Sequence, residues 1–333
     1  ASLCEIMLRD SAHIQEFEAE WRNRKAMRNG GDPYVPLYTM DEALGALKLF
    51  VPHRYQEKFT LFPGMDVRFI DAGHLLGSAS IELWLTENEV QKKLIFSGDI
   101  GNLNQPLIRD PQVPQEADYV IMESTYGNRL HEKPKGYLPG LVNVLRETFS
   151  RGGSLIIPSF AVGRTQEMLY YFKQIKDQKL LPEFGDFPIY MDSPLAIEAT
   201  DIFMRNKESC FDEEALSYVQ RGENPIGVSG LIPAVTSEAS KAINADKRPK
   251  VILSASGMCD AGRIKHHLKH NLWKPENTIL FVGYQAEGSL GRKIVEGAHY
   301  VTLFGENVQV KAQIVQLQGM SGHADQKGLM SWI

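Results

Sequence analysis

Four side chains that lie far apart in the sequence could together act on a phosphate group. His74, Asp99 and Glu123 each follow an apolar, strand-like segment, and His323 follows another and precedes a helix-like one. Because ligands of open α/β folds gather at the carboxyl ends of strands, we expect these side chains to lie close together. Imidazole and carboxylate groups suit a divalent metal such as zinc, so His74 and Asp99 are candidate metal ligands.

The second histidine and the glutamate indicate proton transfer beside such a metal. A carboxylate near an imidazole orients the ring and favours its charged form. Glu123 and His323 are therefore candidates for a pair that holds a proton while the metal activates a water molecule. This combination suits the hydrolysis of a phosphodiester.

Each of these residues also has an ordinary structural explanation. A glycine-flanked histidine at a strand end, such as His74, is more often a hydrogen-bonded turn residue than a ligand. Asp99 follows Gly98 and could belong to a turn. Residues 123–125 could cap a helix, and residues 323–325 could simply begin one, with the acid favouring the helix dipole.

The hydrophobic pattern predicts the elements that position these residues. Residues 2–28 carry apolar side chains three and four apart, which predicts an amphipathic helix, and a short helix is expected within 40–50. Residues 58–99 form short strands, most of them bounded by Gly, Pro or Asn. From 118 to 283, apolar strands alternate with helices, which indicates a parallel sheet covered on both faces. Residues 299–333 return to strands and end in a helix from His323.

Composition excludes several classes of protein. The 333 residues include 36 Lys and Arg and 41 Asp and Glu, a net charge of -5, which excludes a wholly basic nucleic-acid-binding surface but not a basic groove. Three scattered cysteines indicate reduced thiols. No apolar run approaches the roughly 18 residues of a membrane span, and no secretory signal opens the chain. We therefore expect a cytoplasmic protein without a membrane partner.

Seven short motifs follow one another along the chain. They are GHLLGSAS (73–80), FSGDIG (96–101), ESTYG (123–127), PSFAVGRTQE (158–167), DSPLA (192–196), SASGMCDAGR (254–263) and GHADQ (322–326). In this order they resemble the β-CASP branch of the metallo-β-lactamase superfamily, over essentially the whole chain. The chain looks like a bacterial β-CASP ribonuclease and is similar to the endonuclease subunit of messenger-RNA 3′-end processing.

The resemblance implies an α/β fold, a partial metallo-β-lactamase αββα sandwich with an inserted, doubly wound β-CASP domain containing a parallel sheet. Residues 1–127 would form the first part of the metallo-β-lactamase domain without its N-terminal strands. Residues 128–297 would form the β-CASP domain, and residues 298–333 a truncated return to the first domain.

The resemblance also implies roles for the four candidate residues. His74 becomes a zinc ligand and Asp99 the carboxylate that bridges two zinc ions, the number expected in a complete active site. Glu123 and His323 correspond to the acidic residue and the histidine of two β-CASP motifs, which would hold and protonate the leaving oxygen while a metal-activated hydroxide attacks phosphorus. RNA is the implied partner, and a homodimer is left open.

A phosphate-binding wall is expected in the inserted domain, because helix starts offer N–H groups and a favourable dipole, and arginine adds bidentate contacts. The alternative is that the serines cap helices and the arginines form salt bridges. His266 shares a predicted helix with two other histidines, for which we favour RNA contact or packing over metal binding. The residues expected to bind substrate are Ser159, Arg164, Ser193, Ser256, Arg263 and His266.

The sequence departs from the family pattern near both ends. No two histidines are separated by one residue, so the HxHxDH metal motif is absent, and the later His-Gly-Glu motif is not reached before Ile333. Two ligands cannot complete a tetrahedral site, so we expect the printed chain to bind zinc poorly and to have little activity. Either the full protein is longer at both ends or the chain is a degenerate relative.

These features predict a zinc-dependent ribonuclease that processes or degrades RNA, with endonuclease and 5′-exonuclease action both open. The alternative is a catalytically inactive RNA-binding or scaffold homologue, against which the retention of His74, Asp99, Glu123 and His323 argues. A hydrolase of thioesters or lactams is disfavoured, because such enzymes lack the long insert and the ESTYG and GRTQE segments.

Overall fold

The computed structural model describes residues 1–29, 32–131, 136–317 and 321–333. The chain forms two compact units, residues 1–54 and residues 55–333. The first unit contains helices α1 (Ser2–Asn29) and α2 (Met40–Leu47), both expected from the sequence. Thr39 and Glu42 form a reciprocal capping box that satisfies backbone N–H groups at the start of α2.

The second unit begins with a five-stranded sheet. The first four strands pair in antiparallel fashion, and the fifth runs parallel to the fourth. Its strands lie in chain order: β1 (Lys58–Phe62), β2 (Met65–Asp71), β3 (Ala79–Glu87), β4 (Val90–Phe96) and β5 (Tyr119–Ile121). On one face the buried Glu82 carboxylate forms ion pairs with Arg68 (2.5 Å) and Lys93 (2.6 Å), which compensate its burial.

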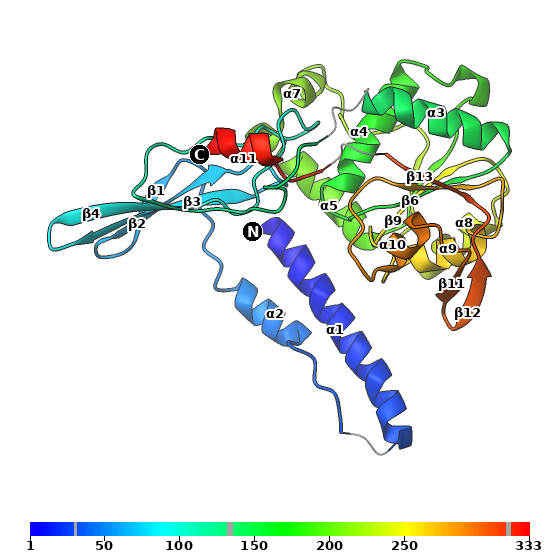
Figure 1. Cartoon of the computed structure of the whole chain (residues 1–333), viewed down its shortest axis with the longest axis horizontal. Coiled ribbons are helices and arrows are strands. Elements are labelled where there is room, and N and C mark those ends of the chain that lie inside the picture. The colour runs from blue at the N-terminus through cyan, green and yellow to red at the C-terminus, as the bar shows by residue number, and fades with distance from the viewer. Residues whose placement is uncertain (30–31, 132–135, 318–320) are drawn as a thin grey trace. The chain divides into compact units, whose positions relative to one another are not determined.

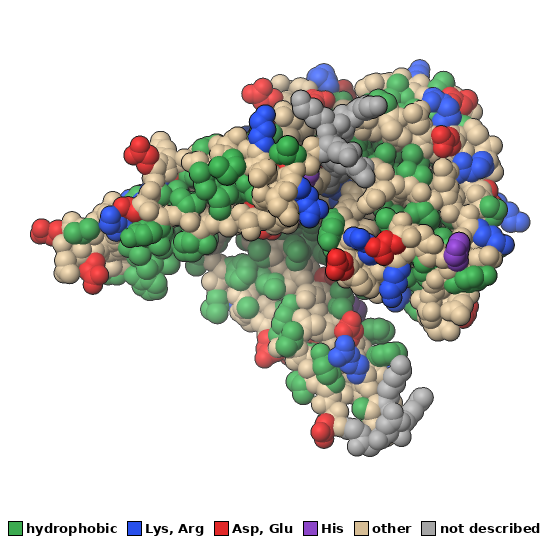
Figure 2. Space-filling view, viewed as in Figure 1, with side chains coloured by type: hydrophobic (Ala, Val, Ile, Leu, Met, Phe, Trp, Pro, Cys, Tyr) green, Lys and Arg blue, Asp and Glu red, His purple; other side chains and the backbone are tan. Residues whose placement is uncertain are grey.

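This sheet leaves apolar side chains on the surface. Tyr119, Val120 and Ile121 of β5 are 43–58% exposed, and Phe62 of β1 is 62% exposed. Figure 2 shows apolar side chains gathered over the strand-rich part of the unit. Among the described strands β5 pairs only with β4, so its apolar residues lie at an edge of the sheet.

The second sheet has six strands, all parallel where they pair. They are β6 (Leu155–Pro158), β7 (Ile189–Met191), β8 (Leu231–Pro233), β9 (Val251–Ser254), β10 (Thr278–Phe281) and β13 (Gln313–Gln316). The order across the sheet is β13-β10-β6-β9-β7-β8. Every residue of β6, β9 and β10 is buried, as expected for strands covered on both faces. The inserted parallel α/β sheet predicted from the sequence is thereby confirmed.

Helices cover this sheet on both sides. In Figure 1, α3, α4 and α5 lie on one side and α8, α9 and α10 on the other. The helices are α3 (Tyr137–Ser150), α4 (Arg164–Asp177), α5 (Pro194–Arg205), α6 (Lys207–Cys210), α7 (Glu213–Gln220), α8 (Ser237–Ala245), α9 (Ile264–Asn271) and α10 (Leu290–Val295), with a 3₁₀ turn η1 (Pro182–Phe184). On one side Ile243, Leu268 and Ile294 pack against Ile156 and Ile252 of the strands. No helix within the described ranges combines the length and apolarity that a bilayer crossing needs.

The C-terminal elements divide between the two sheets. The hairpin of β11 (Tyr300–Leu303) and β12 (Glu306–Gln309) contributes apolar side chains to the core of the second sheet, and β13 pairs with β10. The second sheet therefore extends past the boundary expected at residue 297, as far as Gln316. The helix α11 (Gln326–Trp332) returns to the first sheet, where Leu329 and Trp332 pack with Ile95.

The turn between α3 and β6 contains two adjacent glycines with different constraints. A Cβ on Gly153 would lie 1.8 Å from the carbonyl oxygen of Glu276, whereas one on Gly152 would meet nothing within 4 Å but would occupy a backbone with φ of +72°. We predict that Gly152→Ala lowers the free energy of unfolding by about 1 kcal/mol. Gly153→Ala should cost more, because two backbone segments must separate. Equal losses in urea denaturation of the two variants would contradict this close approach.

Candidate functional site

Backbone pairing brings the loops after β2 and β4 next to the segment that precedes α11. Residues 322–324 pair in antiparallel fashion with residues 100–102 through two backbone hydrogen bonds of 2.9 and 3.1 Å. The Gly101 N–H in turn donates to the Ala72 carbonyl (2.7 Å). Three segments that are distant in the sequence are therefore joined by their main chains, before any side chain is considered.

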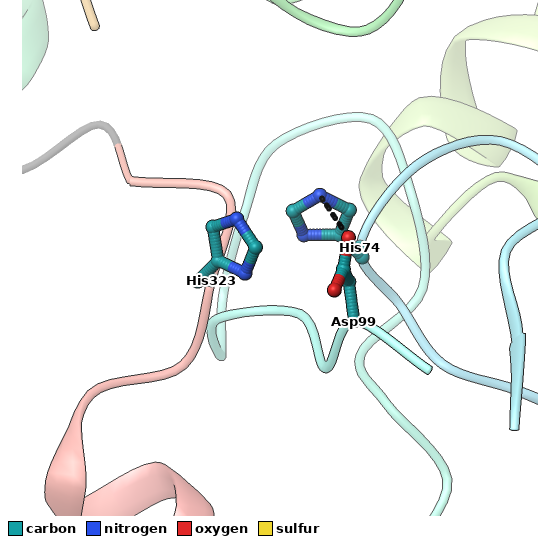
Figure 3. A group of neighbouring side chains, drawn as sticks. All are labelled: His74, Asp99 and His323. Atoms are coloured by element: carbon teal, nitrogen blue, oxygen red, sulfur yellow. Dashed lines mark ion pairs between the residues drawn. The ribbon is translucent and has the colours of Figure 1, made fainter. Parts of the chain in front are cut away.

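His74, Asp99 and His323 form a group that could hold a metal ion (Figure 3). One nitrogen or oxygen atom from each lies within 4.8 Å of the others. Nε2 of His74 is 4.0 Å from Oδ2 of Asp99, and the centroids of the two imidazole rings are 4.4 Å apart. The Asp99 side chain is 60% exposed, so the group is open to solvent on that side.

A backbone contact sets the protonation pattern of His74. Its Nδ1 lies 2.9 Å from the Gly322 carbonyl oxygen, and since a carbonyl only accepts, Nδ1 must carry the proton. Nε2 then presents its lone pair towards Asp99. Burial lowers the pKa of His74, and the charge of His323 lowers it further. His74 is therefore neutral near pH 7, the form in which histidine binds metals.

Glu123 and His323 form a hydrogen-bonded pair beside this group. Nδ1 of His323 lies 3.0 Å from Oε2 of Glu123, whose side chain is only 6% exposed. The hydrogen bond to Glu123 raises the pKa of His323, although burial opposes it. By itself, burial would raise the pKa of Glu123. Hydrogen bonds from His323, Thr125 and the Ile100 backbone outweigh burial and hold the pKa of Glu123 below its usual value. The pair thus favours a carboxylate beside an imidazolium.

Further residues that the sequence analysis did not single out hold His323 in place. Nε2 of His131 contacts the His323 carbonyl oxygen (2.9 Å), and the Tyr126 ring lies edge-on to both histidines. The Gln105 amide donates to the Gly322 carbonyl (2.9 Å). Tyr126 belongs to the ESTYG segment and could have been found there, whereas His131 and Gln105 carry no sequence signal.

The four candidate residues therefore lie together, as their positions after strands led us to expect. Their catalytic and metal-binding roles stay predictions. Asp325 serves as the N-cap of α11 by accepting a hydrogen bond from the Gly328 N–H, so the helix-start explanation also holds for this segment.

The serines expected to bind phosphate have partners within the protein. Ser193 caps α5 by accepting a hydrogen bond from the backbone three residues later. The buried Ser159 hydroxyl lies 3.0 Å from that of Thr165, and the Ser256 hydroxyl donates to the Ala261 carbonyl (3.2 Å). These contacts match the structural alternative, in which the serines support the turns that they occupy.

The two arginines of the predicted phosphate wall are also engaged. Arg164 forms an ion pair with Glu167, one turn along α4, and both side chains are nearly buried. Arg263 donates to the carboxylate of Asp192 (2.7 Å) and to the carbonyls of Ala234 and Val235. In this conformation both guanidinium groups support the inserted domain.

Asp192 explains why Arg263 turns inward. Its wholly buried carboxylate also accepts hydrogen bonds from the Ser240 hydroxyl (2.5 Å) and from Nε2 of His267 (2.6 Å). A buried carboxylate needs such partners to offset its lost hydration. His266, the neighbouring residue on α9, is exposed, and its ring stacks on Phe304 with centroids 4.4 Å apart.

The start of α4 lies beside the loop between β2 and β3 that carries His74, here called the His74 loop. A small cavity is bordered by His74, Gly163 and Glu167, among others. The side chain of Leu75 is so near that a Cβ on Gly163 would lie 2.5 Å from it. The GRTQE segment therefore packs against the loop that carries a candidate metal ligand.

Comparisons with known proteins agree with these observations. Residues 165–294 match the family model of the Beta-Casp domain, and residues 307–333 match that of the Zn-dependent metallo-hydrolase RNA specificity domain. The chain is 37% identical over 331 residues to Ribonuclease TTHA0252 of Thermus thermophilus, covering 99% of this chain and 70% of that protein.

Archaeal relatives are also similar. Transcription termination factor FttA of Methanosarcina mazei is 32% identical over 296 residues, covering 86% of this chain and 45% of that protein. An RNase J-like protein of Methanocaldococcus jannaschii is 34% identical over 284 residues, covering 84% of this chain and 63% of that protein. The chain thus spans only part of the length of each relative.

Asp71 shapes the turn that presents His74, and its protonation should make stability depend on pH. Its buried carboxyl group accepts a hydrogen bond from the Gly73 N–H (2.9 Å). Burial raises the pKa of Asp71 to about 6, in spite of that hydrogen bond and the charge of Arg109. Between about pH 4 and pH 6 the folded protein therefore holds this proton more tightly than the unfolded chain does. The contribution of Asp71 to the free energy of unfolding must therefore fall as the pH rises from about 4 to about 6.

We predict that Asp71→Asn, which keeps an acceptor but does not titrate, gains stability relative to the wild type between pH 4 and pH 7. The relative gain should be about 3 kcal/mol at most. Urea denaturation at pH 4, 5, 6 and 7 measures it, and Asp201→Asn, at an exposed position of α5, controls for the loss of a surface charge. A stability difference between Asp71→Asn and the wild type that is independent of pH would contradict the burial of a titrating carboxyl group here.

Proposed function

Because the chain belongs to the β-CASP branch of the metallo-β-lactamase superfamily, we propose that it provides the active site of a metal-dependent ribonuclease. The observation that carries the proposal is the convergence of His74 and Asp99 with the Glu123–His323 pair. RNA as substrate is supported by the family model of an RNA specificity domain and by a relative named as a ribonuclease. The proposed reaction is hydrolysis of RNA phosphodiester bonds.

The residues present fit a divalent metal. His74 is a neutral imidazole whose Nδ1 is hydrogen-bonded to a carbonyl, which leaves Nε2 free to bind a metal. Asp99 offers an exposed carboxylate 4.0 Å from this Nε2. Nitrogen and carboxylate ligands of this kind suit zinc. We propose that His74 and Asp99 would hold zinc, of which the site would take two ions. When bound, the metal supplies Lewis-acid activation of water and of the scissile phosphate.

The Glu123–His323 pair fits the general acid of this reaction. Nδ1 of His323 is committed to Glu123, so Nε2 is the nitrogen that can give a proton to the departing 3′ oxygen. Glu123 stays ionised and stabilises the charged ring until the proton leaves. The backbone pairing of residues 322–324 with residues 100–102 holds this donor beside His74 and Asp99.

Replacing Asp99 tests the metal site. In the intact protein, Asp99→Ala should lower the zinc content and abolish turnover, because the exposed carboxylate is one of the proposed metal ligands. Elemental analysis and single-turnover cleavage of a labelled RNA measure the two effects, and Asp201→Ala on α5 is the matched surface control. If zinc content and rate were both unchanged, Asp99 would not be a ligand, and a non-catalytic RNA-binding role would gain support.

Replacing His323 tests the general acid. His323→Ala should slow single-turnover cleavage by about 10²–10⁴-fold while RNA affinity stays within a factor of about 2, because the proton donor acts only in the transition state. Zinc content should be unchanged. If zinc content fell, His323 would be a third metal ligand, which its position also permits. If affinity collapsed while the cleavage rate held, His323 would bind RNA instead of protonating the leaving group.

A further inference from the structure

Exposed rings lie on one side of the second sheet, where α9 meets the hairpin of β11 and β12 (Figure 1). The rings of His266 and Phe304 stack with centroids 4.4 Å apart, and the Lys269 ammonium group pairs with the Glu306 carboxylate (2.6 Å). These two contacts hold the tip of the hairpin against the exposed face of α9. The four residues of the proposed active site take no part in them.

The turn of this hairpin does not require a phenylalanine. Leu303 pairs with Glu306, so Phe304 and Gly305 form a two-residue turn, in which their φ angles are +52° and +83°. Turns in which both φ angles are positive favour asparagine, aspartate or glycine, and a bulky side chain is strained there. Phe304 is also 50% exposed. Neither the turn nor core packing therefore explains why an aromatic ring stands at this tip.

The aromatic surface continues along α9. His266, His270 and Trp273 have the i, i+4, i+7 spacing of one helix face. The backbone of Leu272 is still helical, so Trp273 prolongs this face past the end of the helix, and its side chain is 52% exposed. At 1.5 Å per residue the face from His266 to Trp273 is about 10 Å long, which corresponds to about three stacked bases.

The charge of this face is positive. Residues 261–275 contain no aspartate or glutamate. The Lys265 ammonium group lies 5.3 Å from the centroid of the Phe304 ring. That of Lys274 lies 5.5 Å from the centroid of the Trp273 ring. Within the described ranges neither lysine forms an ion pair, so both are available to an incoming anion, and the field beside the rings attracts phosphates.

The two exposed histidines add aromatic surface to this face. Burial lowers the pKa of His270, and the charges of Lys269 and Lys274 lower it further. Burial also lowers the pKa of His266, as do the neighbouring histidines and Lys269. Both rings are therefore neutral near pH 7, and the positive charge of the face comes from its lysines.

We propose that α9 and the tip of the β11–β12 hairpin bind single-stranded RNA outside the active site. Bases stack on the rings of Phe304 and Trp273, and phosphates pair with Lys265 and Lys274. Because every base has a face that can stack, this surface binds RNA without sequence preference. The inference rests on the proposed function, since RNA is the proposed substrate.

Two observations favour RNA over a protein as the occupant. The lysines beside the rings complement phosphates, and no acidic residue of α9 opposes them. Residues 307–333, which include most of β12, match the family model of an RNA specificity domain.

The surface starts near the proposed active site. β6 and β9 are parallel neighbours, so α4 and α9, which follow them, begin at the same edge of the second sheet. The start of α4 packs against the His74 loop. An RNA held at His74 and Asp99 therefore reaches α9 with the nucleotides that flank the scissile bond.

Fluorescence anisotropy tests the stacking. The probe is a labelled oligouridylate of about 20 nucleotides, in EDTA so that a metal-dependent nuclease cannot cleave it. Phe304→Asn should weaken binding about 10-fold, as for the loss of one stacked base, and Trp273→Ala should act likewise. Thermal unfolding of Phe304→Asn should be unchanged or shifted upward, because asparagine suits this turn. Phe304→Tyr, which keeps the ring, and the control Phe62→Asn, at an exposed position of β1, should stay within about twofold of the wild type.

The salt dependence of the same binding tests the phosphate contacts. Lys265→Gln should lower the slope of log affinity against log salt concentration by about 0.7, the value for one phosphate contact to a single strand. Lys179→Gln, in the exposed turn after α4, is the matched control and should leave the slope unchanged.

Three outcomes would overturn the inference. One is the absence of saturable RNA binding by the wild type. Another is unchanged affinity in both Phe304→Asn and Trp273→Ala, which would leave the exposed rings to a protein partner. The last is an equal loss in Phe304→Asn and Phe62→Asn, which would mean that RNA responds to any exposed ring.

The proposed function fails or stands separately. If the metal-loaded wild type cleaves RNA while Phe304→Asn keeps full affinity, this surface is wrong and the nuclease stands. If Phe304→Asn loses affinity while the metal-loaded wild type does not cleave, the surface stands and the nuclease is wrong.

Discussion

The antiparallel contact between residues 322–324 and residues 100–102 is the interaction on which the candidate site depends. It places the Gly322 carbonyl where it orients His74, and it places His323 beside a glutamate 200 positions earlier in the chain. The helix α11 stabilises this contact, because its Leu329 and Trp332 pack on the end of β4. Main-chain hydrogen bonds and a small apolar cluster thus determine where the reactive groups lie.

The second sheet uses its charged residues in a different way. The carboxylates of Asp192 and Glu167 are buried and must be paired, because lone charges are strongly disfavoured away from water. Asp192 pairs with Arg263 and His267, and Glu167 pairs with Arg164. These pairs lie where strands turn into helices, which is also where a phosphate would be expected to bind. Motif residues in the inserted domain therefore stabilise its loops, and one of these loops, at the start of α4, packs against the His74 loop.

Much of the fold follows from local patterns. Both N-terminal helices, the strands from β1 to β5 and the alternation from β6 to α5 occur where hydrophobic periodicity and turn residues predict them. The region 206–245 was not predicted in detail, because its helices α6, α7 and α8 are short and β8 has only three residues. The place of β13 in the second sheet was missed because strand pairing is a non-local choice that the strand's own sequence does not reveal.

For the site, the sequence alone determined which residue types stand at the ends of strands, and that is enough to propose metal binding and proton transfer. Only the tertiary structure decided that Nε2 is the unprotonated nitrogen of His74 and that Glu123 contacts His323. It also decided that Arg164 and Arg263 turn towards internal carboxylates. The physical reason is that an arginine, serine or histidine has several partners of similar energy available. Which partner it takes depends on the distance, burial and charge of groups that the folded chain brings near it.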